Sequence, residues 1–287
     1  MFSTITRQVI TASTSLSSAI QRPSWAGQVS AVFHTSLQLT GPGKTLLHVH
    51  GGPFLVSPFS FRVDGSLAED VQEGRVAVGM PVMKHGSCIE IGSRLRLWLD
   101  SARIYHSPDP PRQPLDPEGV SLARQLLTRG WNAGGLARIS GGADMLADLQ
   151  RALASYDANQ GLAISQQLIG LGPGLTPSGD DILVGCLKGL WLRTGTEPHL
   201  HTTLDLWRHS LLPRLQECTT AVGAAFIHHA LQGQFAEVLD GAAAALFVPT
   251  DPGALAVAMA RLLSQGQTSG TDTALGLLLS LEAALNG

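Results

Sequence analysis

The chain has 287 residues, of which 44% are hydrophobic and 14% are charged, and its formal net charge is −3. This length allows one large domain or two smaller ones, each with its own core. The combination of low charge and high hydrophobicity excludes a disordered chain, and the lack of any basic excess argues against a nucleic-acid partner. The low charge also suggests a surface that is partly covered by partner subunits.

Three cysteines, Cys88, Cys186 and Cys218, lie far apart in the sequence and form no Cys-x-x-Cys pair. This pattern is typical of reduced thiols and does not predict a disulfide framework or a zinc ribbon. Residues 1–20 contain no continuous apolar segment of the signal-peptide kind, and no uninterrupted apolar run elsewhere is long enough to span a membrane. We therefore expect a cytoplasmic protein that does not cross a membrane.

The first 105 residues are rich in strand signals. Alternating and β-branched residues predict strands, separated by glycine and proline turns, at 29–40, 44–50, 75–83, 87–91 and 94–99. Short strands at this spacing are typical of a small barrel or sandwich. On a strand, the imidazoles of His48 and His50 would face the same side and could bind a metal, but no third ligand is evident nearby, and a strand-end turn is the more common meaning of such a pair.

A proline-rich connector follows at 107–117, SPDPPRQPLDP. Proline fixes φ and removes an amide donor, so this segment is expected to be stiff. Beyond it, segments rich in alanine and leucine predict helices at 117–129, 142–156, 160–170, 179–194, 200–215, 219–232, 234–247, 252–265 and 272–285. The predicted class is α+β, with a barrel- or sandwich-like β-rich domain over 1–115 and a helical domain over 116–287.

The most informative motif is GLGPGLTPSGDDILVGCL at 170–187, a glycine-rich loop before a helix that begins near Ser178. Its glycines let backbone amides approach a ligand, and the start of a helix favours oxyanions. The apolar residues of the helix predict one buried stripe. Asp180 and Asp181, in the first turn, would repel a bare anion. Either Mg²⁺ bridges the carboxylates and the anion, or one aspartate caps backbone amides while the other meets a substrate N–H or a partner.

The motif has a second copy at 266–276, GQTSGTDTALG. Ser269 matches Ser178, and Asp272 matches Asp181. Two such helix starts, facing each other across a pseudo-symmetric cleft, would form one ligand site. The alternative is structural, because Ser178 as an N-cap with Asp181 three residues later resembles a capping box, and aspartates at a helix start stabilise the helix without any further function.

The candidate catalytic residues are Asp180, Asp181 and Asp272, and the first two are the candidate metal ligands. The candidate ligand-binding residues come from the loops and hydroxyls of both motifs and from the start of a third helix, namely Gly172, Gly174, Thr176, Ser178, Gly179, Thr268, Ser269, Gly270, Thr219 and Thr220. His229, next to His228, shares a helical face with apolar residues, and a satisfied core or interface histidine is the favoured interpretation.

Three stretches of the C-terminal half resemble the AllH family of oxamate carbamoyltransferase subunits: GLGPGLTPSGDDILVG at 170–185, TTAVGAAFIHHALQGQF at 219–235 and GQTSGTDTALGLLL at 266–279. The resemblance is general in the N-terminal region. It implies a cytoplasmic component of a multi-subunit enzyme of purine (allantoin) nitrogen catabolism, which moves a carbamoyl group between oxalurate and phosphate and gives oxamate and carbamoyl phosphate. Gln267 stands where the family carries histidine, so an acid–base role is not carried over to that position.

Three hypotheses follow. In the first, the chain is an enzyme component that binds a small carboxylate or phosphate substrate at the paired helix starts and works with the other subunits of its complex. In the second, it is a non-catalytic assembly subunit whose motifs are helix caps. In the third, it is a metal-dependent carboxylase or lyase with Mg²⁺ or Mn²⁺ at the aspartates.

Overall fold

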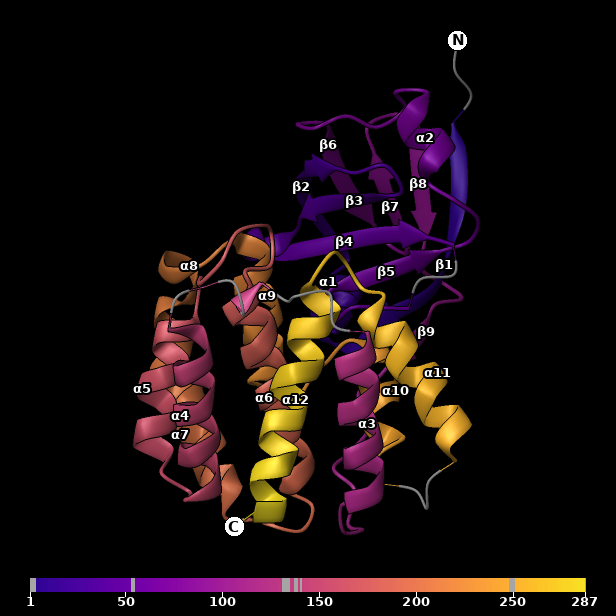
Figure 1. Ribbon diagram of the computed structural model, residues 1–287. Coiled ribbons are helices and arrows are strands. Elements are labelled where there is room, and N and C mark those ends of the chain that lie inside the picture. The colour runs from indigo at the N-terminus through magenta and orange to yellow at the C-terminus, as the bar shows by residue number, and fades with distance from the viewer. Residues whose placement is uncertain are drawn as a thin grey trace. The chain divides into compact units, whose positions relative to one another are not determined.

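The computed structural model describes residues 4–52, 55–130, 135–136, 139, 141–247 and 251–286, and the chain divides into two compact units, 1–106 and 107–287 (Figure 1). The first unit is built of strands and the second of helices, so the predicted α+β class is confirmed. The whole proline-rich connector, residues 107–117, belongs to the helical unit. In the described part of the chain, no helix combines the length and hydropathy that a bilayer span requires.

The first unit is a closed, mixed β-barrel. Its strands are β1 Ile5–Ser13, β2 Ser24–Val32, β3 Ser36–Thr40, β4 Leu46–Gly51, β5 Ser60–Val63, β6 Pro81–His85, β7 Cys88–Ile91, β8 Leu95–Trp98 and β9 Arg103–Tyr105. They pair in the order β5-β4-β3-β2-β6-β7-β8-β1, and β1 pairs with β5 to close the ring, while β9 adds to β1. The pairs β1–β8, β1–β9 and β4–β5 are parallel, and the others are antiparallel. Closure leaves no free edges among these eight strands.

Alternation along the strands fills the barrel. Leu37 and Leu39 of β3, and Leu47 and Val49 of β4, are completely buried, while the residues between them are more exposed or polar. This is the period of two that the sequence displays. Two short helices, α1 Ser17–Gln21 and α2 Ala68–Gln72, accompany the strands.

The strand prediction needs two corrections. The segment predicted at 29–40 is a hairpin whose turn begins where the Phe33 amide donates to the Ser36 carbonyl, so it contributes to two strands. The strands β1, β5 and β9 were not predicted; β1 pairs with both β5 and β9 across long stretches of sequence.

The second unit is helical, as predicted. Its helices are α3 Pro117–Arg129, α4 Gly142–Ala154, α5 Ala158–Leu168, α6 Ser178–Arg193, α7 Leu200–Leu211, α8 Leu215–Cys218, α9 Ala221–Ala230, α10 Glu237–Ala244, α11 Pro252–Leu263 and α12 Ser269–Asn286. Side-chain caps set several of these starts: Asp116, Asp157 and Asp251 accept hydrogen bonds from amides in the first turns of α3, α5 and α11.

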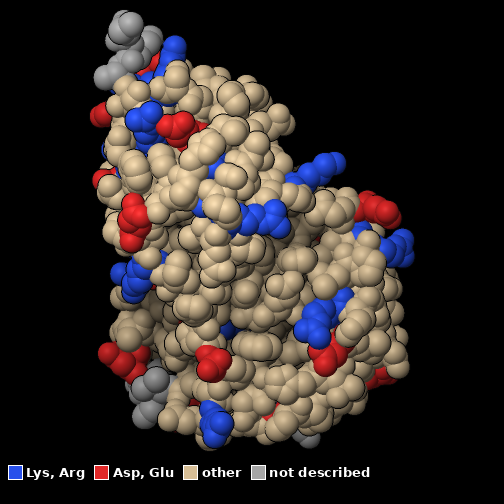
Figure 2. All heavy atoms as spheres, turned by 180° about the vertical axis from the view of Figure 1, so that it is seen from behind, with Lys and Arg blue, Asp and Glu red and all other residues tan. Residues whose placement is uncertain are grey.

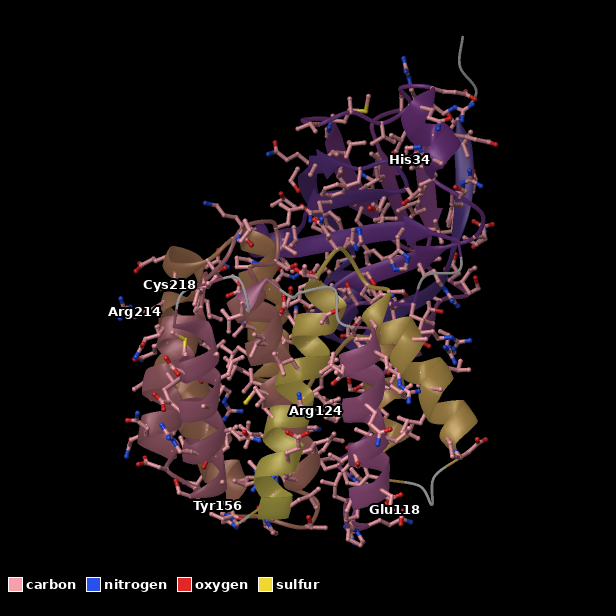
Figure 3. The ribbon with its side chains drawn as sticks, viewed as in Figure 1. His34, Glu118, Arg124, Tyr156, Arg214 and Cys218 are labelled. Carbon is pink, nitrogen blue, oxygen red and sulfur yellow. The ribbon has the colours of Figure 1, made fainter. Side chains whose placement is uncertain are left out.

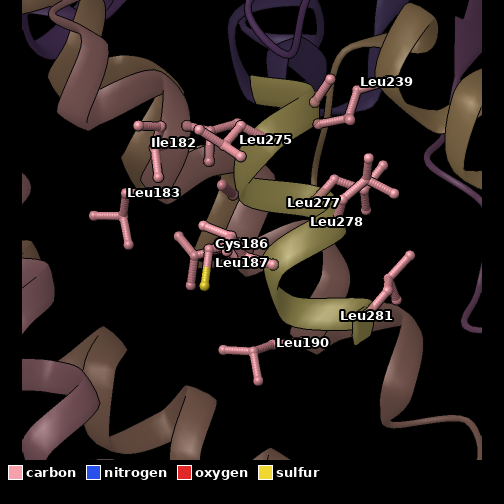
Figure 4. Packing of buried hydrophobic residues seen from close by; sticks show 14 of the residues in the cluster. Ile182, Leu183, Cys186, Leu187, Leu190, Leu239, Leu275, Leu277, Leu278 and Leu281 are labelled. Carbon is pink, nitrogen blue, oxygen red and sulfur yellow. The ribbon is translucent and has the colours of Figure 1, made fainter. Parts of the chain in front are cut away.

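The centre of this unit is the contact between α6 and α12, whose leucines interdigitate (Figure 4). Glycine allows the two backbones to touch. A Cβ atom at Gly276 would lie 1.9 Å from the Ile182 carbonyl oxygen, and one at Gly185 would lie 2.0 Å from the Thr273 carbonyl oxygen. The stripe predicted for α6 is wrong, because nearly every residue from Ser178 to Leu190 is buried and the helix is covered on all sides.

The helical unit buries several charged groups, and ion pairs compensate some of them. Lys188 of α6 forms a 2.6 Å ion pair with Asp240 of α10. The Ser107 hydroxyl donates to Asp240 at 2.7 Å and accepts the Phe235 amide at 2.8 Å, so the connector is tied to the helices. Arg124, which points from α3 toward α12, binds Glu282 through two hydrogen bonds (Figure 3).

The surface is sparsely charged. On the face seen in Figure 2, lysine and arginine are interspersed with aspartate and glutamate, and wide uncharged areas separate them. This distribution matches a composition in which 14% of residues are charged.

Candidate functional site

Two helix–loop–helix units, α5–α6 and α11–α12, carry the two sequence motifs in the same way. A Cβ atom at Gly179 would lie 1.9 Å from the Leu168 carbonyl oxygen of α5, and one at Gly270 would lie 1.9 Å from the Leu262 carbonyl oxygen of α11. Each glycine therefore lets the second helix of its unit start directly against the end of the first. The repeat in sequence is thus a repeat in structure.

The two motifs meet at the starts of α6 and α12. The hydroxyl oxygens of Thr176 and Ser269 lie 2.8 Å apart and share a hydrogen bond. The Ser269 hydroxyl also interacts with Asp181 of the other motif, and the Ser178 hydroxyl interacts with Asp272. Each serine therefore faces the aspartate of the opposite motif.

Asp180 makes different hydrogen bonds from the adjacent Asp181. Its Oδ1 accepts the Gly170 amide at 2.7 Å, and its Oδ2 accepts the Thr219 hydroxyl. Burial raises the pKa of Asp180, and these two hydrogen bonds act in the opposite direction. Asp180 therefore fastens the glycine-rich loop and the start of α9 to α6.

Asp181 and Asp272 keep acceptor capacity. Asp181 is 7% exposed and Asp272 is 1% exposed, and the Oδ2 of Asp181 and both carboxylate oxygens of Asp272 receive no well-aligned hydrogen bond from the described residues. Hydroxyls of both motifs nevertheless lie close enough to these carboxyls to favour their charged forms. A buried acceptor without a partner is costly, so these oxygens are suited to a ligand N–H.

Burial dominates the electrostatics of this pair. It raises the pKa of Asp181 from 3.8 to about 8, and the neighbouring charges of Asp272 and Asp180 add to the shift. Burial also raises the pKa of Asp272, against hydrogen bonds from Ser178, Thr268 and the backbone amides of Gly135 and Leu136. At neutral pH the pair therefore presents a protonated carboxyl at Asp181 beside Asp272.

Protein-family models match residues in both units of the chain. Residues 168–281 match the family described as oxamate carbamoyltransferase subunit AllH, and residues 8–104 match the AllH family N-terminal domain. The chain belongs to the AllH family. The resemblance seen in the C-terminal motifs is confirmed, and it extends to the barrel. No solved structure matches the chain.

In this member of the AllH family, the loop between α5 and α6 is shaped by glycines in the left-handed region. Gly172 has φ of +115° and Gly174 has φ of +105°. A Cβ atom at Gly172 would lie 3.0 Å from the Ser178 amide nitrogen, whereas one at Gly174 would meet nothing. The loop thus returns tightly onto the start of α6, as close approach of backbone requires.

The capping-box interpretation of Ser178 is wrong. Pro177 occupies the cap position of α6, and no side chain caps this helix. Thr220 does act as a cap, because its hydroxyl accepts the Gly223 amide at 3.0 Å, and it also donates to the Leu175 carbonyl. The Ser178 hydroxyl therefore does not cap α6 and interacts with Asp272 instead.

One contributor was missed. A Cβ atom at Gly135 would lie 1.8 Å from the Ser178 hydroxyl oxygen and 3.4 Å from Asp272 Oδ2, so the backbone at this glycine rests on both motifs. The tandem glycines at 134–135 are the signal that could have drawn attention to it.

The histidine and metal candidates lie as follows. His229 is half-buried, and its Nδ1 lies 3.0 Å from Gln234 Oε1, while His228 contacts Gln232. Burial lowers the pKa of His229 to about 4. Within the described ranges, no three histidine, cysteine, aspartate or glutamate side chains gather as metal ligands. The Mg²⁺ site at Asp180 and Asp181 stays a prediction, and Asp180 already accepts two hydrogen bonds.

Proposed function

We propose that this oxamate carbamoyltransferase subunit holds the carbamoyl group of the substrate at the crossed pair of motifs, with Asp181 and Asp272 as its contacts. The observation that carries the proposal is the crossed arrangement, in which two buried aspartates, with carboxyl oxygens that receive no well-aligned hydrogen bond from the described residues, interact with each other's motifs at two helix starts. Gly172, Gly174 and Gly179 belong to the motif at the start of α6, and Thr268 and Gly270 to the motif at the start of α12.

The chemistry of the pair fits an amide. A carbamoyl group presents a carbonyl acceptor beside N–H donors, and the protonated carboxyl of Asp181 beside the carboxyl oxygens of Asp272 offers a complementary donor and acceptors. No lysine or arginine of the described chain acts on the pKa of Asp181 or Asp272. A phosphate or carboxylate on its own would therefore meet like charge here, which favours the amide alternative over the bare oxyanion.

The reaction that this proposal serves is the transfer between oxalurate and phosphate. The bond between the carbamoyl carbon and the oxamate nitrogen breaks, a phosphate oxygen bonds to that carbon, and the nitrogen takes up a proton. The Asp181 proton, placed on the carbamoyl oxygen, stabilises the charge that develops there, and Asp272 orients the amide nitrogen. In this role the chain serves purine nitrogen catabolism as part of a multi-subunit cytoplasmic enzyme.

The test is turnover by the complex reconstituted with its other subunits. Asp272→Asn keeps the shape and removes the acceptor charge, and Asp181→Asn removes the proton that can be transferred or shared. We expect each to lower kcat/KM at least about 100-fold, the size typical of a lost positioning or electrostatic group, without lowering the melting temperature. Asp148→Asn, on the surface of α4 where Asp148 pairs with Arg151, is the matched control and should leave turnover unchanged.

The competing function is that of a non-catalytic assembly subunit. The near-complete burial of Asp272 is the observation that favours it, since an internal carboxylate can also serve only to hold two helix starts together. Normal turnover in both asparagine variants would select this role. Retained turnover that depends on added Mg²⁺ or Mn²⁺ would instead favour a metal site at the aspartates.

A further inference from the structure

A second polar cluster lies in the barrel, on the side of β4 and β5 opposite the core. His48 and His50 alternate with the fully buried Leu47 and Val49. In the parallel ladder, His48 is in register with Ser60, and His50 is in register with Arg62. Partners in register present their side chains on one face of a sheet, so these four residues form a single patch.

Hydrogen bonds hold this patch in place. The ring centroids of His48 and His50 are 5.4 Å apart, and His50 Nε2 lies 3.3 Å from the Ser60 hydroxyl. Ser60 also accepts the Ser57 amide at 2.8 Å. The Arg62 guanidinium donates to the Thr11 hydroxyl on β1 at 3.2 Å. His50 is 4% exposed and Ser60 is fully buried, while His48 and Arg62 keep partial exposure, so part of the cluster stays accessible to a solute.

Donors in this cluster remain unused. The Nε of Arg62 and the hydroxyl of Ser57 are buried and make no hydrogen bond with the described residues. No aspartate or glutamate in the described part of the chain forms an ion pair with Arg62. An arginine without a carboxylate, held beside hydroxyls and imidazoles, is an incomplete arrangement.

The charge of the cluster favours an anion over a cation as the missing component. Burial lowers the pKa of His48 to about 4. Burial, followed by the charges of His48 and Arg62, lowers the pKa of His50 to about 3. Both imidazoles are therefore neutral at pH 7, and Arg62 supplies a net positive charge. A metal ion at His48 and His50 would face this guanidinium with two ligands only, whereas an anion would meet a cation and several neutral donors.

We propose that the Arg62 cluster, made of His48, His50, Ser57, Ser60 and Arg62, binds a small oxyanion, a phosphate or a carboxylate group. The guanidinium presents its unused N–H to an anionic oxygen, and the Ser57 hydroxyl donates to the same group. All of these residues belong to the barrel, so the inference does not depend on the function proposed for the paired aspartates.

Direct binding to the full chain, without partner subunits or turnover, tests the proposal. Inorganic phosphate and acetate are titrated separately at constant ionic strength, with calorimetry for the dissociation constant and NMR of the histidine ring protons for the location. We expect at least one of the two anions to bind and to shift the resonances of His48 and His50 among the ten histidines of the chain. The stronger of the two anions identifies the oxyanion class.

Arg62→Gln should weaken that binding at least tenfold, because it removes the only charge of the cluster. Arg96→Gln is the matched control: Arg96 also lies on a barrel strand, but it is half-exposed and pairs with Glu90, and its loss should leave binding unchanged. Equal affinity in the unaltered chain and in Arg62→Gln would overturn the proposal, as would the absence of binding of both anions. If Arg62→Gln does not fold, the NMR titrations of the unaltered chain test the proposal on their own. Anion-induced shifts confined to other histidines would overturn it. Tighter binding of Zn²⁺ than of either anion at His48 and His50 would overturn it as well.

Discussion

Replacing Asp181 by asparagine should make the protein more stable at neutral pH, although the residue lies at the proposed site. The folded state raises the pKa of this carboxyl from 3.8 to about 8, chiefly through burial. The folded chain therefore holds a proton that the unfolded chain releases between these two values. The stability that this group contributes is complete below pH 4 and is lost as pH rises toward 8. Asparagine does not titrate and keeps the shape.

The size of the effect follows from the same shift. Each pH unit between the two pKa values corresponds to about 1.4 kcal/mol, so the ceiling at pH 7 is about 4 kcal/mol. Relaxation around a buried charge reduces this ceiling, and we expect the asparagine variant to gain about 2–4 kcal/mol over the unaltered chain at pH 7. At pH 4 the carboxyl is neutral in the folded state and only about half ionised in the unfolded state, so the two proteins should differ by less than about 1 kcal/mol.

Urea unfolding of the full chain at pH 4, 5, 6, 7 and 8 measures this difference. Asp148→Asn, which removes a surface carboxylate of α4, is the control, and its difference from the unaltered chain should stay within about 1 kcal/mol throughout. A difference between Asp181→Asn and the unaltered chain that does not change with pH would refute the reasoning. So would a variant that becomes relatively less stable as the pH rises.

Three further outcomes concern the packing and the thiols. Gly276→Ala places a methyl group 1.9 Å from a carbonyl oxygen of α6 and should cost at least about 2 kcal/mol in urea unfolding, whereas Gly241→Ala on α10, with nothing within 4 Å, should stabilise by up to about 1 kcal/mol. Lys188→Met leaves Asp240 buried without its cation, and we expect a loss of about 3–5 kcal/mol in the same measurement, part of which the additional change Asp240→Asn should restore. In native buffer the exposed thiol of Cys218 should react with Ellman's reagent in a fast phase, and the two buried thiols only after unfolding; three fast thiols would contradict the burial.

The helices could be predicted because their signals are local. In α3, for example, Asp116 caps the helix and Pro117 starts it, and both are visible in the sequence. The missed strands lack such signals. β5 has four residues, and it is held by parallel pairing with β4 and antiparallel pairing with β1, fifty residues away in the chain. A strand this short gains its stability from its partners and not from its own pattern.

The sequence identified the residues of the candidate site but not the role of each one. The repeat of Ser-Gly-x-Asp pointed to Asp181 and Asp272 without any structure. Which of the adjacent residues Asp180 and Asp181 fastens the loop depends on how α6 is rotated against α9 and α12, and this rotation is fixed by tertiary packing. The tandem glycines at 134–135 could have marked Gly135 as special, but not its role, which is to leave room for the Ser178 hydroxyl across a distance in sequence.

The contact between α6 and α12 has a consequence for the order of events during synthesis. Residues 194–268 separate the two helices, and a ribosome needs about 4–15 s to add them at about 5–20 residues per second. Throughout that interval α6, which is buried on nearly every side in the finished protein, has no α12 to cover it. The emerging chain therefore exposes an aggregation-prone helix until its last residues leave the ribosome, and a nascent chain that stops before Ser269 lacks both the cover and Asp272.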